Sequence, residues 1–149
     1  MPRTLVLLLL VVAAGSLLSD LGPAKAEPNL EKRSRLALEN ADRQMDEADK
    51  AYDSGGWDRV LAALKETRAS VDLAIESLKQ SGKNPRSGGK YFKNAEIRTR
   101  ELARKIDSFR QKASGEEQAP IEELRAHVQR VHDELLDAIM SRTKWRGPQ

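Results

Sequence analysis

The chain of 149 residues contains no cysteine and few aromatic residues. Without cysteine it can form no disulfide, no thiolate metal site, no catalytic thiol and no covalent c-type haem attachment. Phenylalanine, tryptophan and tyrosine make up only 4% of the residues, whereas 33% are charged, with 26 Lys and Arg against 23 Asp and Glu. This composition is typical of a single helix-rich domain rather than of a multidomain enzyme.

The first 26 residues have the pattern of a secretory signal peptide. Arg3 supplies an early positive charge, residues 5–14 form an apolar run, and Ala-Lys-Ala at 24–26 is the small-x-small pattern that signal peptidase accepts. A permanent membrane anchor would need about 20 apolar residues, and this run is interrupted from Gly15 onward. We therefore predict that residues 1–26 are removed and that the protein is exported, to the periplasm or out of the cell. After this cleavage no transmembrane span is expected, and an exported protein of this kind has no nucleic acid as its partner.

Four stretches of similar length follow, separated by segments rich in glycine, serine and proline. In each stretch apolar residues recur at spacings of three and four, which predicts amphipathic helices, and none alternates with the period of two that a strand requires. The predicted helices cover about 29–54, 57–81, 90–114 and 119–141, and a basic tail occupies 142–149.

The apolar faces of the first two predicted helices differ in character. The first is narrow and mostly small, with Ala41 and Ala48 on either side of Met45, which permits a close approach by a neighbouring helix. The second has Leu61 and Leu64 on its apolar face, with Arg68 in one place where an apolar residue is expected.

Amphipathic helices of this length cannot bury their apolar faces alone, but they can do so against one another. We therefore predict an all-α fold, an antiparallel four-helix bundle. The alternative is two stacked helical hairpins, as in an α-solenoid, because residues 52–64 resemble the inter-helix turn of a tetratricopeptide repeat through Tyr-Asp-Ser-Gly-Gly-Trp followed by Val60 and Leu64. That resemblance implies helical hairpins and a groove for a partner peptide. No second copy of the turn appears one repeat length away.

Charge is unevenly distributed along the chain. Residues 83–112 hold ten cations and three acids, whereas residues 116–140 hold seven acids and two cations. One interpretation is that the third helix and the loop before it form a surface for an anionic partner. The other is that neighbouring helices pair: Arg98, Lys105 and Lys112 would then face an antiparallel neighbour that carries His127 and Glu134.

The candidate binding surface consists of cations that the apolar pattern leaves exposed. The loop at 82–90 combines glycines and cations ahead of a helix N-terminus, where free N–H groups attract anions. It is no nucleotide phosphate loop, because Tyr91 stands where a Ser or Thr is required. Trp145, in the basic tail, is suited to a lipid headgroup interface or to a partner protein. The candidate residues are Lys83, Arg86, Lys90, Lys93, Arg100, Arg104 and Trp145.

No motif for catalysis or metal binding is found. His127 and His132 are five residues apart and so lie on different sides of a helix. The sequence also lacks the Glu-x-x-His of carboxylate metal sites and the Gly-x-Ser-x-Gly of a nucleophile elbow. Met45 together with His127 resembles the ligand layout of b-type cytochromes, which hold haem between a methionine and a histidine. This resemblance implies a periplasmic haem carrier as an alternative function.

We accordingly expect an exported, non-catalytic helical module that acts by binding or as a scaffold, with neither cofactor nor metal. Its partner would be a protein or an anionic envelope component. A purely structural protein is a further alternative. The run from Lys83 through Arg100, and His-Asp-Glu-Leu-Leu from His132, resemble uncharacterised exported helical proteins of environmental bacteria, which implies no particular activity.

Overall fold

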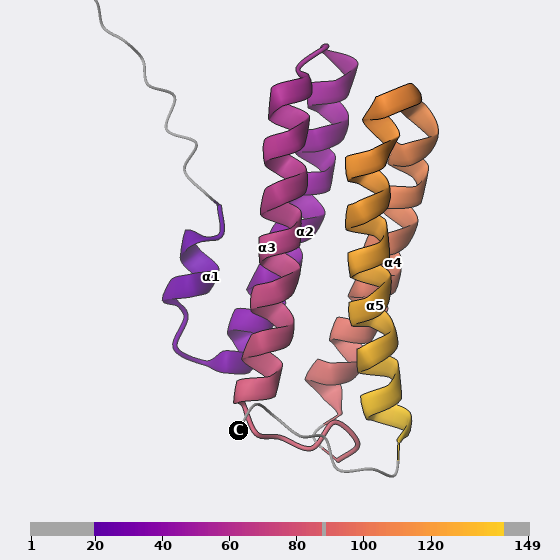
Figure 1. Ribbon diagram of the computed structural model, residues 1–149. Coiled ribbons are helices and arrows are strands. Elements are labelled where there is room, and N and C mark those ends of the chain that lie inside the picture. The colour runs from indigo at the N-terminus through magenta and orange to yellow at the C-terminus, as the bar shows by residue number, and fades with distance from the viewer. Residues whose placement is uncertain (1–19, 88, 142–149) are drawn as a thin grey trace, which may run out of the picture.

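Residues 20–87 and 89–141 are described by the computed structural model, and within these ranges the chain forms helices and no strand. The prediction of an all-α fold is therefore confirmed for these residues. The elements are α1 (Gly22–Ala26), α2 (Leu30–Asp53), α3 (Trp57–Gln80), α4 (Lys90–Lys112), the short 3-10 helix η1 (Gly115–Glu117) and α5 (Gln118–Met140) (Figure 1).

Local sequence explains where α2 begins and ends. The side chain of Asn29 accepts a hydrogen bond from the backbone N–H of Lys32 at 2.9 Å, which satisfies one of the free donors of the first turn. The helix ends in the turn at residues 54–56, where Gly55 has a φ of +74°. Since this left-handed conformation is strained for other residues, glycine makes the reversal into α3 possible.

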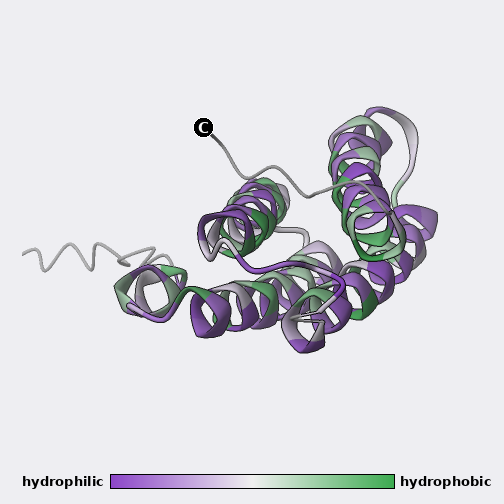
Figure 2. Ribbon diagram, turned by 90° about the horizontal axis from the view of Figure 1, so that it is seen from below, coloured by the Kyte–Doolittle hydropathy of each residue, from purple (hydrophilic) through white to green (hydrophobic). Residues whose placement is uncertain are grey.

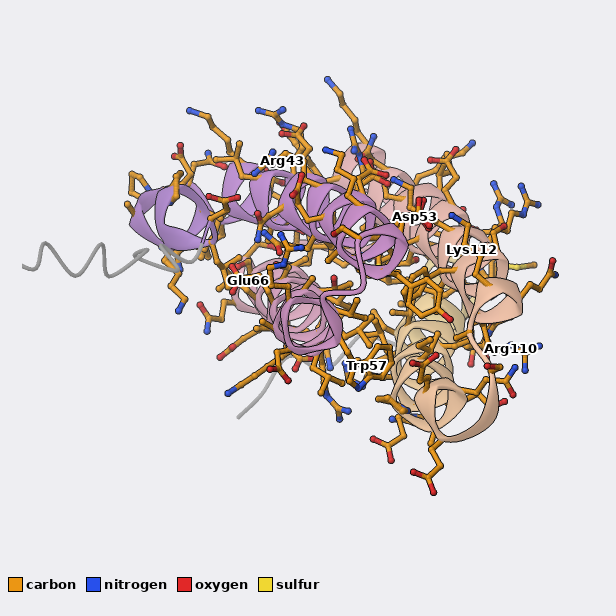
Figure 3. All side chains as sticks on the ribbon, turned by 90° about the horizontal axis from the view of Figure 1, so that it is seen from above. Arg43, Asp53, Trp57, Glu66, Arg110 and Lys112 are labelled. Atoms are coloured by element: carbon orange, nitrogen blue, oxygen red, sulfur yellow. The ribbon has the colours of Figure 1, made fainter. Side chains whose placement is uncertain are left out.

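The helices pack as a bundle of two antiparallel hairpins, α2–α3 and α4–α5, which lie side by side (Figures 1 and 3). Between the hairpins α2 packs on α4 and α3 packs on α5, and each of these two contacts is parallel. Each long helix thus has one antiparallel and one parallel neighbour. This is the arrangement expected for two stacked hairpins, the alternative that the turn at residues 52–64 suggested.

The core lies between the four long helices, whose hydrophobic sides face one another (Figure 2). At the end of the bundle that contains the α2–α3 turn, the ring of Tyr52 makes edge contacts with Trp57 and Phe109, at centroid distances of 6.3 and 5.6 Å. The hydroxyl of Tyr52 donates toward Glu117 at 3.0 Å, so this residue joins both hairpins. The largest fully buried side chains include Phe92, Met45, Leu78, Ile106, Ile121 and Leu135.

The contact between α2 and α3 is the most extensive in the bundle, and several of its buried residues are small. Ala37, Ala41 and Ala48 of α2 are fully buried, and α3 contributes Thr67 and Ser70 with no exposed surface. The hydroxyls of both α3 residues donate to the carbonyl four positions earlier at 2.8 Å, so they are satisfied within their own helix.

The buried side of α3 differs from the predicted apolar face. Leu61 is 39% exposed and Arg68 is also exposed, whereas Thr67 is buried. The prediction that positions 61 and 68 lie on the apolar face of α3 was wrong, because it assumed that the core requires large apolar residues. A short hydroxyl side chain that bonds its own backbone allows closer packing than a leucine does.

The small-residue contact gives a test of the fold. We expect Ala41→Leu to lower the free energy of unfolding by about 1–3 kcal/mol, because the added methylenes have no space between α2 and α3. The matched control is Ala62→Leu on the exposed side of α3, which should change stability by less than about 0.5 kcal/mol. Urea denaturation monitored by circular dichroism measures both, and equal stability of the two variants would contradict this packing.

Candidate functional site: the outer face of α4

One flank of α4 is occupied by ion pairs to α2. Lys105 contacts the carboxylates of Asp42 and Asp46, each at 2.7 Å. One heptad later, Lys112 contacts Asp49 at 2.7 Å. Because both helices run in the same direction, residues seven apart on α4 meet residues seven apart on α2.

The same flank extends to both ends of this contact. Arg98, a heptad before Lys105, lies 3.7 Å from Glu39, which also accepts a hydrogen bond from Arg35 at 2.7 Å. Asp53, at the end of α2, lies 3.6 Å from Lys112, and Figure 3 shows the two side chains facing each other. The cations at 98, 105 and 112 are therefore used within the fold.

The expected partners of this flank were wrong. His127 and Glu134 of α5 do not face it, because α5 contacts the parallel helix α3: His127 Nε2 lies 2.6 Å from Asp72, and Lys79 pairs with Glu134. The basic flank instead faces α2, whose outward acids were not considered in the sequence pattern.

Some pairing between α4 and α5 does occur. Arg110 contacts Glu122 at 3.1 Å, and Arg125 contacts Asp107 at 3.0 Å. These pairs form a second flank of α4, opposite to the flank that contacts α2. The side of α4 that lies between the two flanks and away from the core is its outer face.

Cations recur along this outer face at spacings of three and four. Lys90, Lys93, Arg100 and Arg104 are exposed, with the half-buried Ile97 in the same row. Arg100 lies 3.6 Å from Glu96 of its own helix. Within residues 20–87 and 89–141, Lys90, Lys93 and Arg104 have no ion pair. The exposed Glu101 also lies beside the row.

A hollow lies at the base of the row, where the α3–α4 loop meets the start of α4. It is open to solvent and has a volume of about 410 Å³. The cations Arg86, Lys90 and Lys93 stand around it, and its surface is mostly apolar. Its remaining lining residues are Pro85, Gly89, Asn94, Ile97 and Ile139.

The structure thus brings together most of the candidate binding residues. Arg86, Lys90 and Lys93 share the hollow, and Arg100 and Arg104 continue the row. Lys83 is separate, because it pairs with Glu31 at the start of α2 at 2.7 Å. Trp145 lies outside the described residues.

The apolar part of this site was not predicted from the sequence. Ile97 stands between Lys93 and Arg100 at the same helical spacing, so the pattern of the sequence already contained it. Ile139 could not be found in this way, because only the packing of α5 against α4 brings it to the hollow.

The residues proposed to hold haem are not brought together. Met45 is 1% exposed on α2, and the His127 ring is held by Asp72. Asn40 of α2 bonds Ser70 of α3, so these two residues lie at the same level of the antiparallel hairpin. Asp72, which holds His127, is then level with residue 38 of α2. Met45 lies about seven residues, or ~10 Å, along the bundle from that level.

In the part of the chain that the structure describes, the gap between the four long helices is also too small for a porphyrin. A packing gap lined by residues of all four long helices, among them Leu38, Val71, Thr99 and Val131, is too small for a water molecule. A ligand of porphyrin size needs a cavity of roughly 300 Å³ or more. The residues present therefore do not fit a haem between α2 and α5.

The second histidine has a different environment. His132 Nε2 lies 2.9 Å from Glu96 Oε1, and both side chains are close to nine-tenths buried between α4 and α5. Asp133 lies on the other side of the ring, with 3.3 Å between its Oδ1 and His132 Nδ1. Hydrogen bonds from Gln129 and then from His132 lower the pKa of Asp133.

Residues 20–87 and 89–141 contain no group of three or more His, Asp and Glu side chains that is placed to hold a metal ion. In the same ranges, each helix is too short or too polar to span a membrane.

The α2–α4 ion pairs predict a specific pH dependence. Burial lowers the pKa of Lys105, but hydrogen bonds to Asp42 and Asp46 raise it by more, so its pKa lies above the ordinary 10.5. A lysine whose pKa is raised by folding stabilises the folded state at pH values below the unfolded pKa. This contribution is lost as the pH rises through the folded pKa.

We therefore expect Lys105→Gln to lower the free energy of unfolding by about 1 kcal/mol at pH 7. The difference from the wild type should shrink above pH 10.5, the ordinary lysine value. Urea titrations across this range measure it, with Lys65→Gln on the exposed side of α3 as control. A loss that is the same at all pH values would contradict the ion pairs.

Comparisons with known proteins assign no relative to this chain. No family model, no curated protein and no solved structure matches it. The chemistry of the outer face of α4 is therefore the basis on which a function is proposed.

Proposed function

We propose that this protein is an exported, non-catalytic helical binding module that contacts an anionic component of the cell envelope through the outer face of α4. The observation that carries the proposal is the division of charge on α4. The cations of one flank are paired with α2, whereas Lys90, Lys93 and Arg104 on the outer face have no ion pair within the described residues.

A row of exposed cations attracts an anionic surface over a distance set by the salt concentration, about 8–10 Å under physiological conditions. Each cation near an anionic membrane surface contributes about 1 kcal/mol. Three such residues would thus provide about 3 kcal/mol, or roughly 100-fold in affinity. The row is long enough to meet several anionic groups at once, since α4 rises about 1.5 Å per residue.

The hollow at the base of the row favours an amphiphile over a simple polyanion. Ile97 and Ile139 supply apolar surface there, and Arg86, Lys90 and Lys93 supply positive charge around it. A lipid with an anionic headgroup matches both features, because its charge meets the cations and its glycerol and upper acyl chain meet the apolar surface. We therefore propose anionic lipid as the envelope component.

Binding to vesicles tests this function. The purified protein should bind vesicles of phosphatidylglycerol and phosphatidylcholine more tightly than vesicles of phosphatidylcholine alone, and added salt should weaken the binding. Replacing Lys90, Lys93 and Arg104 together by Gln should weaken it roughly 100-fold. Co-sedimentation with vesicles over a series of salt concentrations measures these effects.

A charge-matched variant controls for the change in net charge. Lys50, Lys65 and Arg68 are exposed cations of α2 and α3, and replacing all three by Gln removes the same charge far from the outer face of α4. If this variant loses as much affinity as the first, or if salt has no effect, the outer face of α4 is not the contact surface.

The apolar part of the hollow gives a separate prediction. Full burial of an isoleucine side chain contributes about 1.5–3 kcal/mol, and the half-buried Ile97 has about half of this left to gain, so Ile97→Gln should weaken vesicle binding roughly fivefold. The same variant should bind poly-glutamate as the wild type does, because a simple polyanion uses only the cations. Equal loss with both partners would contradict a lipid contact in the hollow.

A further inference from the structure

The short helix α1 belongs to the folded core of this protein. Leu21 and Ala24 are each only 2% exposed and pack in the same hydrophobic cluster as the residues of α2 and α3. Figure 1 shows α1 beside the α2–α3 hairpin, on the side away from α4 and α5. The exposed residues of α1, including Lys25, face solvent.

A buried polar network of the hairpin also bonds the start of α1. The backbone N–H of Leu21 donates to Glu66 Oε1 at 3.1 Å. The same oxygen accepts a hydrogen bond from Asn40 at 3.3 Å, and Asn40 itself is fully buried and donates to Ser70 at 2.9 Å. Figure 3 shows Glu66 on the side of the hairpin that faces α1. The network therefore links α1 to both helices of the hairpin.

Hydrogen bonds and an ion pair also fix the connection between α1 and α2. The Nε–H of Arg33 donates to the carbonyl of Glu27 at 2.8 Å, and the backbone N–H of Glu27 donates to the carbonyl of Ala24 at 3.2 Å. Lys32 pairs with the Glu27 carboxylate at 2.8 Å and, by this bond, lowers the pKa of Glu27. The bond between residues 26 and 27, which the sequence pattern marks as the cleavage site, thus joins the last residue of α1 to its hydrogen-bonded C-cap residue.

We propose that α1 remains in the mature protein and that the leader is removed upstream of it. Cleavage after Ala26 would take Leu21 and Ala24 out of the core and expose the apolar surface of the hairpin that they cover. The proposal rests on the proposed export, since it concerns where an exported chain is cut.

The sequence offers a suitable site upstream. Residues 13–15 (Ala-Ala-Gly) and 14–16 (Ala-Gly-Ser) are overlapping small-x-small tripeptides. They overlap the end of the apolar run at 5–14, whose length lies within the range of about 7–15 residues for a signal peptide. Hydrolysis of one peptide bond by signal peptidase, with one water consumed, leaves a carboxylate on the leader and a new amino terminus at Ser16 or Leu17.

Three full-length chains test the proposal in an exporting bacterium: the wild type, Leu21→Asp and Lys25→Asp. The two variants introduce the same residue into α1, one at a buried position and the other at an exposed position. The exported protein is purified, its intact mass and N-terminal sequence are determined, and its Tm is measured.

We expect the exported wild type to begin at Ser16 or Leu17. Each exported variant should differ from the wild type by the mass of its substitution. Leu21→Asp should lower Tm by several degrees, because it places a charge in the core, and Lys25→Asp should leave Tm nearly unchanged.

Cleavage after Ala26 would give a different result. If the chain is cut after Ala26, all three exported proteins are identical, so one common mass with Glu27 at the N-terminus and one common Tm would overturn the proposal. Retention of all three full-length chains in the cytoplasm would instead overturn the proposed export, and the upstream cleavage with it.

Discussion

The parallel contact between α2 and α4 decides which charges of this protein are balanced within the fold. Stacking of the two hairpins brings Lys105 and Lys112 to the acids of α2, at heptad intervals on both helices. Individual pairs of this kind are worth little at the surface. Their consequence is geometric, because they commit one flank of α4 to α2, whereas Lys90, Lys93 and Arg104 of the outer face have no ion pair within residues 20–87 and 89–141.

The helices themselves could be predicted from the sequence, because apolar spacing and turn residues are local signals. Their neighbours could not. A basic flank on α4 can be satisfied by acids on α2 or on α5, and both helices carry them. Which of the two lies beside α4 depends on how the hairpins stack, and this is a property of the whole core rather than of any one segment.

Other features were missed for related reasons. Thr67 is buried because its hydroxyl bonds the carbonyl of Ala63, a solution that a hydrophobicity pattern cannot register. The helix α1 has five residues, too few to show a period, and Ala24 had already been interpreted as part of a cleavage site. By contrast, the exposure of Lys93, Arg100 and Arg104 followed directly from their position opposite the apolar residues of α4.

The most direct measurement of the α2–α4 contact uses the absence of native cysteine, which allows two to be introduced without interference. A chain carrying Asp42→Cys and Lys105→Cys, treated with a short bis-maleimide, should form an intramolecular cross-link in high yield, because these side chains meet at 2.7 Å. A chain carrying Lys105→Cys and His127→Cys, two positions at the same level of the antiparallel α4–α5 hairpin, should remain unlinked, because His127 faces α3. Cross-linking of the second pair and not of the first would show that α4 lies against a different neighbour, and the division of charge on α4 would then be wrong.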